Sequence, residues 1–212
     1  CALPISRLFD GSYLFSTEVY YKYMQNIYEY KDNADFSYYV PLEEQFTSGR
    51  REAYGIELFL NKRIGKFTGW IGYTLAWTRR QFDELNNGNW FSPRFDRRHD
   101  VSVVVTYKPW ESWEFSAAWV YGTGQAYTMP TGTYFYSDVG DDYNDERYYY
   151  YEKYQYTDRN AFRLPAYHRL DFNAIHHYEW FGLPFQFYIS IYNIYNRRNP
   201  FAWYIDYDSV ET

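Results

Sequence analysis

Bulky apolar residues occupy every second position on both sides of a tight turn in HDVSVVVTYKPWESWEFSAAWVYGTG, residues 99–124. Two is the side-chain period of a β-strand, whose successive residues point to opposite faces. Val101, Val103 and Val105 therefore share one face. The returning strand continues this face with Trp113, Phe115, Ala117, Trp119 and Tyr121. The polar residues in between are too frequent for a strand buried on both sides, so the stretch predicts a hairpin with one apolar and one polar face.

The same alternation recurs along the chain, and helical spacing does not accompany it. The segments with this period are 12–30, 51–61, 67–77, 101–107, 113–121, 167–180 and 185–192. We therefore expect an all-β fold, an antiparallel up-and-down meander of about seven strands.

The expected connections fall into two classes that alternate strictly along the chain. The links at 62–66, 108–111 and 181–184 are short, whereas those at 31–50, 83–98 and 128–165 are long and polar. A soluble β-sandwich has no such rule for its loop lengths. A barrel of the bacterial outer membrane does, because its periplasmic turns are tight and its extracellular loops are long.

Composition narrows the classes of protein in which such an apolar face can occur. Aromatic residues make up 25% of the chain, with 29 Tyr, 17 Phe and 8 Trp, and rings with a polar tip favour boundaries between apolar and aqueous regions. Mean hydropathy is −0.68 and no apolar run reaches the length of a spanning helix. The net charge of −6 argues against a nucleic-acid partner. An aromatic-rich soluble β protein and a membrane β-barrel remain, and the sorted connections favour the barrel with lipid on its apolar side.

The beginning of the chain reads as foreign sequence. Cys1 is the only cysteine, so a disulfide framework is excluded. The end of a common sequencing adapter, TGTGCTCTTCCGATCT, translates as Cys-Ala-Leu-Pro-Ile followed by a codon that permits Ser, which matches residues 1–6. The alternative is a natural mature terminus or a lipoprotein cysteine. We expect residues 1–6 to be an artefact and residues 7–212 to be part of a barrel, since seven strands with open edges cannot close.

Three stretches together resemble the C-terminal barrel of TonB-dependent outer-membrane receptors, in the branch whose N-terminal extension resembles a carboxypeptidase regulatory domain. They are residues 73–130, which include FDRRHD and YGTG, FRLPAYHRLDF at 162–172, and YNIYNRRNPF at 192–201. The resemblance implies a barrel of about 22 strands in a Gram-negative outer membrane, with membrane lipid and the TonB system as partners. It also implies that the TonB box, the plug domain, the earlier strands and the final strand are absent from this chain.

The function implied by the resemblance is TonB-energised uptake of a scarce nutrient, with siderophore, cobalamin, glycan and peptide all open. The TonB system would be contacted through the missing N-terminal region. A passive porin or a surface adhesin barrel is the alternative, and an upstream plug would favour the importer. We expect no enzyme activity, no cofactor and no metal, because no nucleophile–base set accompanies the acidic residues.

A charge cluster lies where the second long link meets a strand. Its members are Asp96, Arg97, Arg98 and Asp100. One interpretation is a network that lines the lumen and contacts plug or ligand. The other is a set of inward ion pairs that fixes strand register, because charges are expelled from a lipid-facing surface.

The third long link carries the candidate ligand contacts. These are Tyr134, Tyr136, Asp141, Asp142, Tyr143, Tyr148, Tyr150 and Tyr154. Tyrosine offers rigid amphipathic contact area, and carboxylates add hydrogen-bond acceptors. The alternative is a solvated extension of strands in which tyrosines stack on their neighbours. The acidic residues do not have the spacing of an EF-hand calcium loop.

Tryptophans are expected at the boundary between lipid and water. Trp110, Trp113 and Trp180 lie at short turns, where an inner aromatic girdle belongs. His176 and His177 are adjacent in an expected strand and should point to opposite faces, so they cannot easily bind one metal ion.

Overall fold

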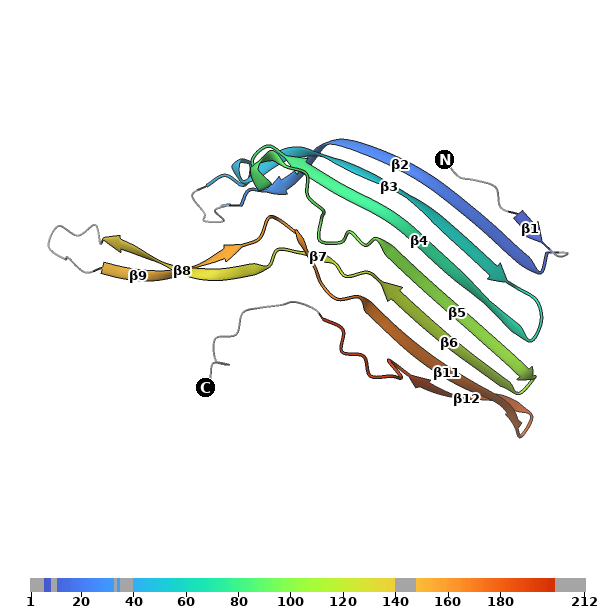
Figure 1. The fold of residues 1–212 in the computed structure, drawn as a ribbon. Coiled ribbons are helices and arrows are strands. Elements are labelled where there is room, and N and C mark those ends of the chain that lie inside the picture. The colour runs from blue at the N-terminus through green and yellow to red at the C-terminus, as the bar shows by residue number, and fades with distance from the viewer. Residues whose placement is uncertain (1–5, 9–10, 33, 35–39, 140–147, 201–212) are drawn as a thin grey trace.

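The computed structural model describes residues 6–8, 11–32, 34, 40–139 and 148–200. Its strands form an eight-stranded antiparallel sheet in the order β1-β2-β3-β4-β5-β6-β11-β12. Their bounds are β1 Ser6–Leu8, β2 Tyr13–Tyr30, β3 Phe46–Lys62, β4 Phe67–Phe82, β5 His99–Trp110, β6 Trp113–Gly122, β11 Tyr167–Trp180 and β12 Leu183–Ile191. The prediction of an all-β antiparallel meander is confirmed (Figure 1).

The seven predicted strands correspond to β2–β6, β11 and β12, and the differences lie at their ends. β3 begins at Phe46, before the predicted start, and β4 continues to Phe82, because polar residues in these ends hid the strand pattern. β5 continues to Trp110 through a register irregularity after Tyr107, so the turn expected at 108–111 is shorter. The short strand β1, paired with β2, was not expected.

The long links contain further elements, of which only strands in the third link were expected, as one of two interpretations. Two short 3₁₀ helices are η1, Leu42–Gln45, and η2, Asn86–Gly88. The third link folds into two small sheets built from β7 Ala126–Tyr127 with β10 Phe162–Arg163, and β8 Pro130–Val139 with β9 Tyr148–Tyr156. The β8–β9 hairpin projects well away from the main sheet (Figure 1).

The register places the alternating apolar residues on one continuous face. Ile71 of β4 lies opposite Leu60 of β3 and Val103 of β5, and Val103 lies opposite Trp119 of β6. Leu170 of β11 follows Trp119 in the same row. One apolar row therefore crosses five strands, as the period-two pattern predicted.

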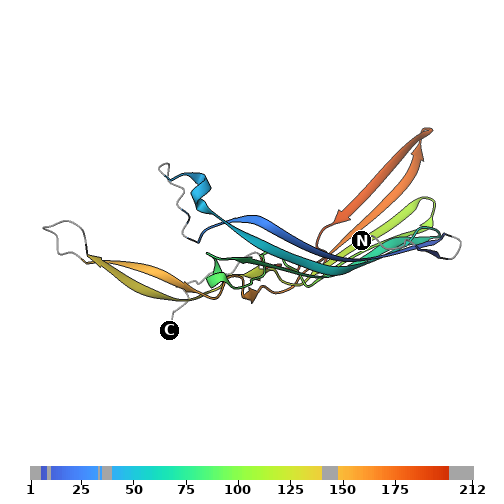
Figure 2. The same ribbon diagram turned by 90° about the horizontal axis from the view of Figure 1, so that it is seen from above.

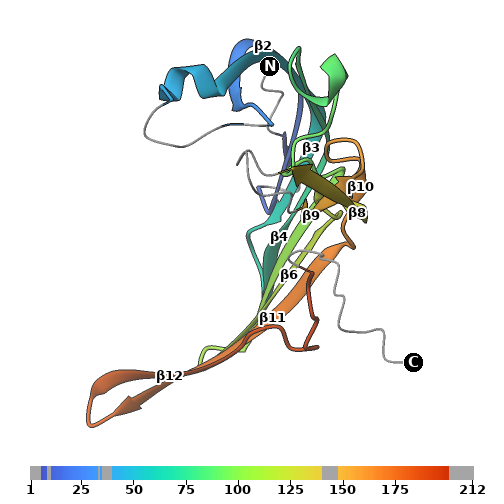
Figure 3. The same cartoon turned by 90° about the vertical axis from the view of Figure 1, so that its left-hand side faces the viewer.

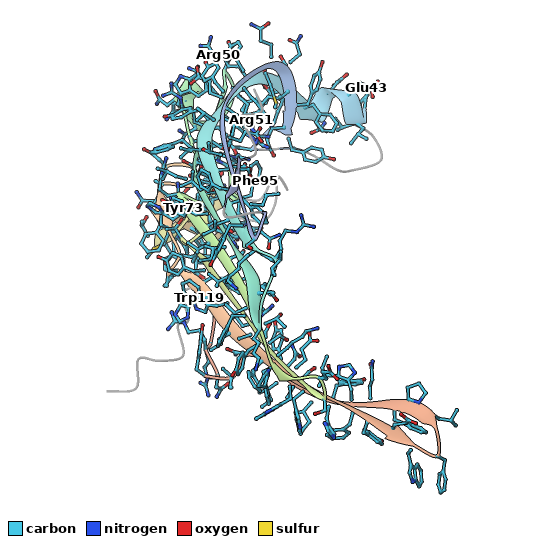
Figure 4. The ribbon with its side chains drawn as sticks, turned by 90° about the vertical axis from the view of Figure 1, so that its right-hand side faces the viewer. Glu43, Arg50, Arg51, Tyr73, Phe95 and Trp119 are labelled. Carbon is cyan, nitrogen blue, oxygen red and sulfur yellow. The ribbon has the colours of Figure 1, made fainter. Side chains whose placement is uncertain are left out.

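The sheet is a single curved layer, and none of the other described elements forms a second layer over either face (Figures 2 and 3). Tyr73 and Trp119, from the apolar face, lie on its convex side, whereas Arg51 and Phe95 point toward the concave side (Figure 4). The accessible surface is 16060 Å². A compact monomer of this mass would expose roughly 10,500 Å².

The buried core is small and lies at one end of the sheet. Phe82, Leu85 and Phe91 form it, with Ile27 packed against them, at the end of β4 and in the connection that follows. β2 reaches this cluster after a bulge between Met24 and Ile27. The cluster packs the ends of β2 and β4 against the 83–98 link, and no such hydrophobic cluster lies at the middle of the sheet within the described part of the chain.

Short and long connections lie at opposite ends of the sheet, as predicted (Figure 1). The turns 63–66, 111–112 and 181–182 share one end, and the links 31–45, 83–98 and 123–166 share the other. Among the residues that the structure describes, no helix combines the length and the apolar character needed to cross a bilayer.

Candidate functional site

A cavity of about 820 Å³ lies where the three long connections meet. Its walls come from the end of β2, the end of β4, the 83–98 link and the residues around 156–160. The charged and aromatic lining includes Glu29, Asp32, Arg80, Phe91, Arg94 and Arg159. This volume falls within the range of small-molecule sites.

Ion pairs cross the cavity between segments that are distant in sequence. Arg80 of β4 lies 2.6 Å from the Oε2 atom of Glu29 on β2. Arg159, after β9, pairs with Asp32 and lies 3.9 Å from the Oε1 atom of Glu29. These contacts fix two guanidinium groups and two carboxylates around one polar space, which can present both donors and acceptors to a ligand.

Aromatic rings support the guanidinium groups of the cavity. The guanidinium carbon of Arg159 lies 5.3 Å from the centre of the Phe91 ring. Phe95 contacts two cations, Arg51 at 5.1 Å and Arg80 at 5.2 Å. Such cation–π contacts orient the planar groups and limit their motion.

Hydrogen bonds tie the long links to one another. The backbone N–H of Arg159 donates to Asn86 Oδ1 at 2.9 Å, joining the third link to η2. Asn160 donates through Nδ2 to the Ser92 carbonyl at 2.8 Å and through its backbone N–H to Thr128 Oγ1 at 2.9 Å. The cavity is therefore formed by connections that hold one another in place.

The structure brings the predicted charge cluster together as two pairs. Arg98 lies 3.9 Å from Asp96, and Arg97 lies 3.4 Å from Asp100. The Asp96 side chain is 1% exposed, and its Oδ1 atom accepts a hydrogen bond of 2.7 Å from the Thr78 backbone N–H. Asp96 thus fixes the end of the 83–98 link to β4.

Sequence reasoning missed the principal partner of Asp96. Arg163 of β10 pairs with the Asp96 carboxylate and also donates to the Asp96 carbonyl oxygen. Close by, an added Cβ at Gly124 would lie 1.4 Å from the Leu164 carbonyl oxygen. The signal was present, because Arg163 and Leu164 belong to the FRLPAYHRLDF motif and Gly124 to YGTG, but nothing in the sequence joined the two motifs.

The tyrosines predicted as ligand contacts belong mainly to the projecting hairpin. Tyr134, Tyr136 and Tyr154 are exposed on β8 and β9, with Tyr134 52% exposed. Lys153 lies 4.9 Å from the Tyr136 ring centre. Tyr148 and Tyr150 belong to β9, whereas Asp141, Asp142 and Tyr143 lie outside the described residues. Tyr134, Tyr136 and Tyr154 do not line the 820 Å³ cavity, so the structure separates these three described side chains from it.

The predicted girdle tryptophans lie at the short-turn end. Trp110 and Trp113 face each other across the β5–β6 turn, and Trp110 is 67% exposed. The Trp113 ring stacks on His176 of β11 with 4.4 Å between centroids. Trp180 is 61% exposed beside the β11–β12 turn. Together these rings form an aromatic edge along the convex face.

The histidines do not converge on a common point. His176 lies opposite Trp113 on the convex face, and its neighbour His177 lies opposite Gln186 on the other face. His168 Nδ1 is 2.8 Å from the Tyr195 hydroxyl. Within the described residues, no group of three or more His, Cys, Asp or Glu side chains could hold a metal ion.

Comparisons with protein-family models, with curated proteins and with solved structures found no match to this chain. The functional interpretation therefore depends on the geometry. Its main elements are a one-layer sheet with an apolar convex face, an aromatic edge at the short turns, and a charged cavity among the long connections.

Proposed function

We propose that this chain forms part of the wall of an outer-membrane β-barrel of the TonB-dependent receptor class, which imports a scarce nutrient. The observation that carries the proposal is the uncovered apolar convex face. Ile71 and Val105 are 46% and 42% exposed in the middle of this face. A soluble protein would bury such a face against a second layer.

Curvature supports lipid rather than protein as the covering medium. When a sheet curls into a barrel, its concave face lines the lumen and its convex face meets the surroundings. In the middle of this sheet, polar residues such as Ser102 and Thr106 occupy the face opposite the apolar rows. Polar inside and apolar outside is the arrangement of a membrane barrel and the reverse of a soluble one.

Both edges of the sheet support the proposal that further strands complete the barrel. β12 pairs only with β11 among the described strands, and β1 covers β2 over three residues. Unpaired backbone groups at such edges are not tolerated within hydrocarbon, so closure requires additional strands. A barrel of about 22 strands, as the family resemblance implies, would supply them.

The cavity among the long connections is the proposed ligand-contact region of the importer. Long connections face outward in this barrel class, so the cavity would open toward the medium from which nutrient arrives. Its arginine and carboxylate groups suit a polar ligand with both donors and acceptors. This chemistry is compatible with each of the nutrient classes considered above.

The reading frame of the natural gene upstream of Arg7 separates active import from passive transport. An importer requires a plug domain and a TonB box on the same polypeptide, so we expect both to be encoded there. Ligand uptake by cells carrying the intact gene should also stop when TonB is removed. A frame that encodes barrel strands without a plug, together with uptake that continues without TonB, would identify a porin or adhesin instead.

A further inference from the structure

We propose that the convex face carries a binding site for one anionic phospholipid, formed by a hollow above Gly69 and by the basic turn at 62–66. The inference rests on the proposed position of this face in a membrane, and it adds a specific lipid site to that surface. The hollow would take part of an acyl chain, and the turn would take the phosphate.

The hollow exists because β4 has no side chain at Gly69, near the start of the strand. Gly69 has φ +146°, and an added Cβ would lie 2.1 Å from the Val104 carbonyl oxygen. No other residue fits this backbone without moving the neighbouring strand. In the register, Lys62 and Val105 lie on either side of Gly69, so a gap opens between them.

The walls of the hollow are apolar. Leu60, Ile71 and Val105 line it, and Phe67 closes the side nearest the turn. The Phe67 ring is stacked on Tyr107 with 4.1 Å between centroids, which fixes this wall. The volume is about 230 Å³. That is less than the roughly 300 Å³ at which pockets for drug-sized ligands begin, and it suits a single alkyl chain.

The adjoining turn places three cations within five residues. Lys62 Nζ donates to the carbonyl oxygens of Ile64 at 2.7 Å and Phe67 at 2.6 Å, so this side chain holds the turn together. Arg63 is exposed and its guanidinium makes no hydrogen bond or ion pair with a described residue. Lys66 is exposed and donates once, to the Pro109 carbonyl at 3.1 Å, which leaves two N–H groups for a ligand.

An amphiphile with a phosphate and an acyl chain matches both halves of this site. Ile64, 59% exposed within the turn, places an apolar side chain among the charges, as expected at the boundary between headgroups and hydrocarbon. Free phosphate would use the turn alone and leave the hollow without a role. Basic side chains at a membrane surface attract anionic lipid, which makes anionic phospholipid the occupant of choice.

The test uses the intact protein extracted from membranes in mild detergent. Native mass spectrometry would compare retention of phosphatidylglycerol and phosphatidylcholine with identical acyl chains. We expect preferential retention of phosphatidylglycerol. Arg63→Gln with Lys66→Gln should reduce it about 25-fold, since each basic side chain near an anionic surface contributes about a factor of five. Ile71→Trp, which fills the hollow, should reduce retention of both lipids.

The matched control is Lys22→Gln with Lys153→Gln, which removes the same charge from exposed positions far from the turn and should leave retention unchanged. Equal retention of the two lipids, or loss of the preference in the control, would overturn the site. If excess inorganic phosphate displaced phosphatidylglycerol and Ile71→Trp had no effect, the turn would be a phosphate site and the lipid assignment would be overturned. Absence of the protein from the membrane fraction would instead defeat the proposed function.

Discussion

If the convex face meets lipid, as proposed, a cation placed on this face at mid-strand should destabilise the protein in a membrane. Val105 lies five residues along β5 from Trp110 of the aromatic edge. At about 3.4 Å per residue and a tilt of about 40°, it is about 13 Å above that edge, near the middle of an apolar band about 25 Å tall. Gly69 and Ala117 lie on either side of it, so an arginine would fit without steric conflict.

Val105→Arg should therefore reduce the free energy of unfolding by about 2–4 kcal/mol, the cost of a lipid-facing arginine at the midplane. The matched control is Thr106→Arg on the same strand, which faces the concave side between Thr68 and Ser116. Its effect should stay within about 0.5 kcal/mol. Denaturant titration of the protein in lipid vesicles measures both values.

The dependence of the arginine's cost on depth distinguishes lipid from a partner protein on the convex face. Val101 lies nine residues from Trp110, near the opposite boundary of the apolar band, where Val101→Arg should cost only about 0–1 kcal/mol. A partner protein packed on the convex face would not produce this decline with depth. Equal costs for Val105→Arg and Thr106→Arg, or for Val105→Arg and Val101→Arg, would refute the reasoning.

Three further predictions concern the connections and the sheet edges. Asp96→Asn should destabilise the protein by about 2–3 kcal/mol in the same titration, because Arg163 loses a charged acceptor, while exposed Asp158→Asn should have little effect. Gly124→Ala should reduce the free energy of unfolding by about 1–3 kcal/mol, because the added Cβ would overlap the Leu164 carbonyl oxygen. The same substitution should expose the 123–166 link to limited proteolysis. Gly132→Ala, where the added Cβ has open space around it, should leave the digestion pattern unchanged. The 212-residue chain expressed alone should aggregate, since both sheet edges are open, and a cooperative melt in detergent would contradict this.

The main sheet was predictable because its cause is local. Alternation along each strand fixes which residues share a face, and the register then joins those faces, as in the row from Leu60 through Ile71 and Val103 to Trp119. The strand ends were less predictable. There Trp110 continues a strand through an irregularity that a two-residue period does not reveal.

The charged cavity and the partner of Asp96 could not be predicted because their contacts are long-range. The ion pairs of Arg159 with Asp32 and of Arg163 with Asp96 join segments separated by 127 and 67 residues. Arginines and carboxylates occur throughout the chain, and no spacing rule selects these pairs. Strands in the β8–β9 region were expected only as one of two interpretations, because tyrosines follow one another there and hide the period of two.

Accessibility of spin labels along β5 tests the central claim most directly. A nitroxide placed singly at each position from 101 to 107, in the protein within a bilayer, reports collisions with oxygen, which concentrates in lipid, and with a water-soluble nickel chelate. We predict oxygen maxima at 101, 103, 105 and 107 and chelate maxima at 102, 104 and 106. The reverse phase, or low access to both reagents at the odd positions, would show that lipid does not cover the convex face.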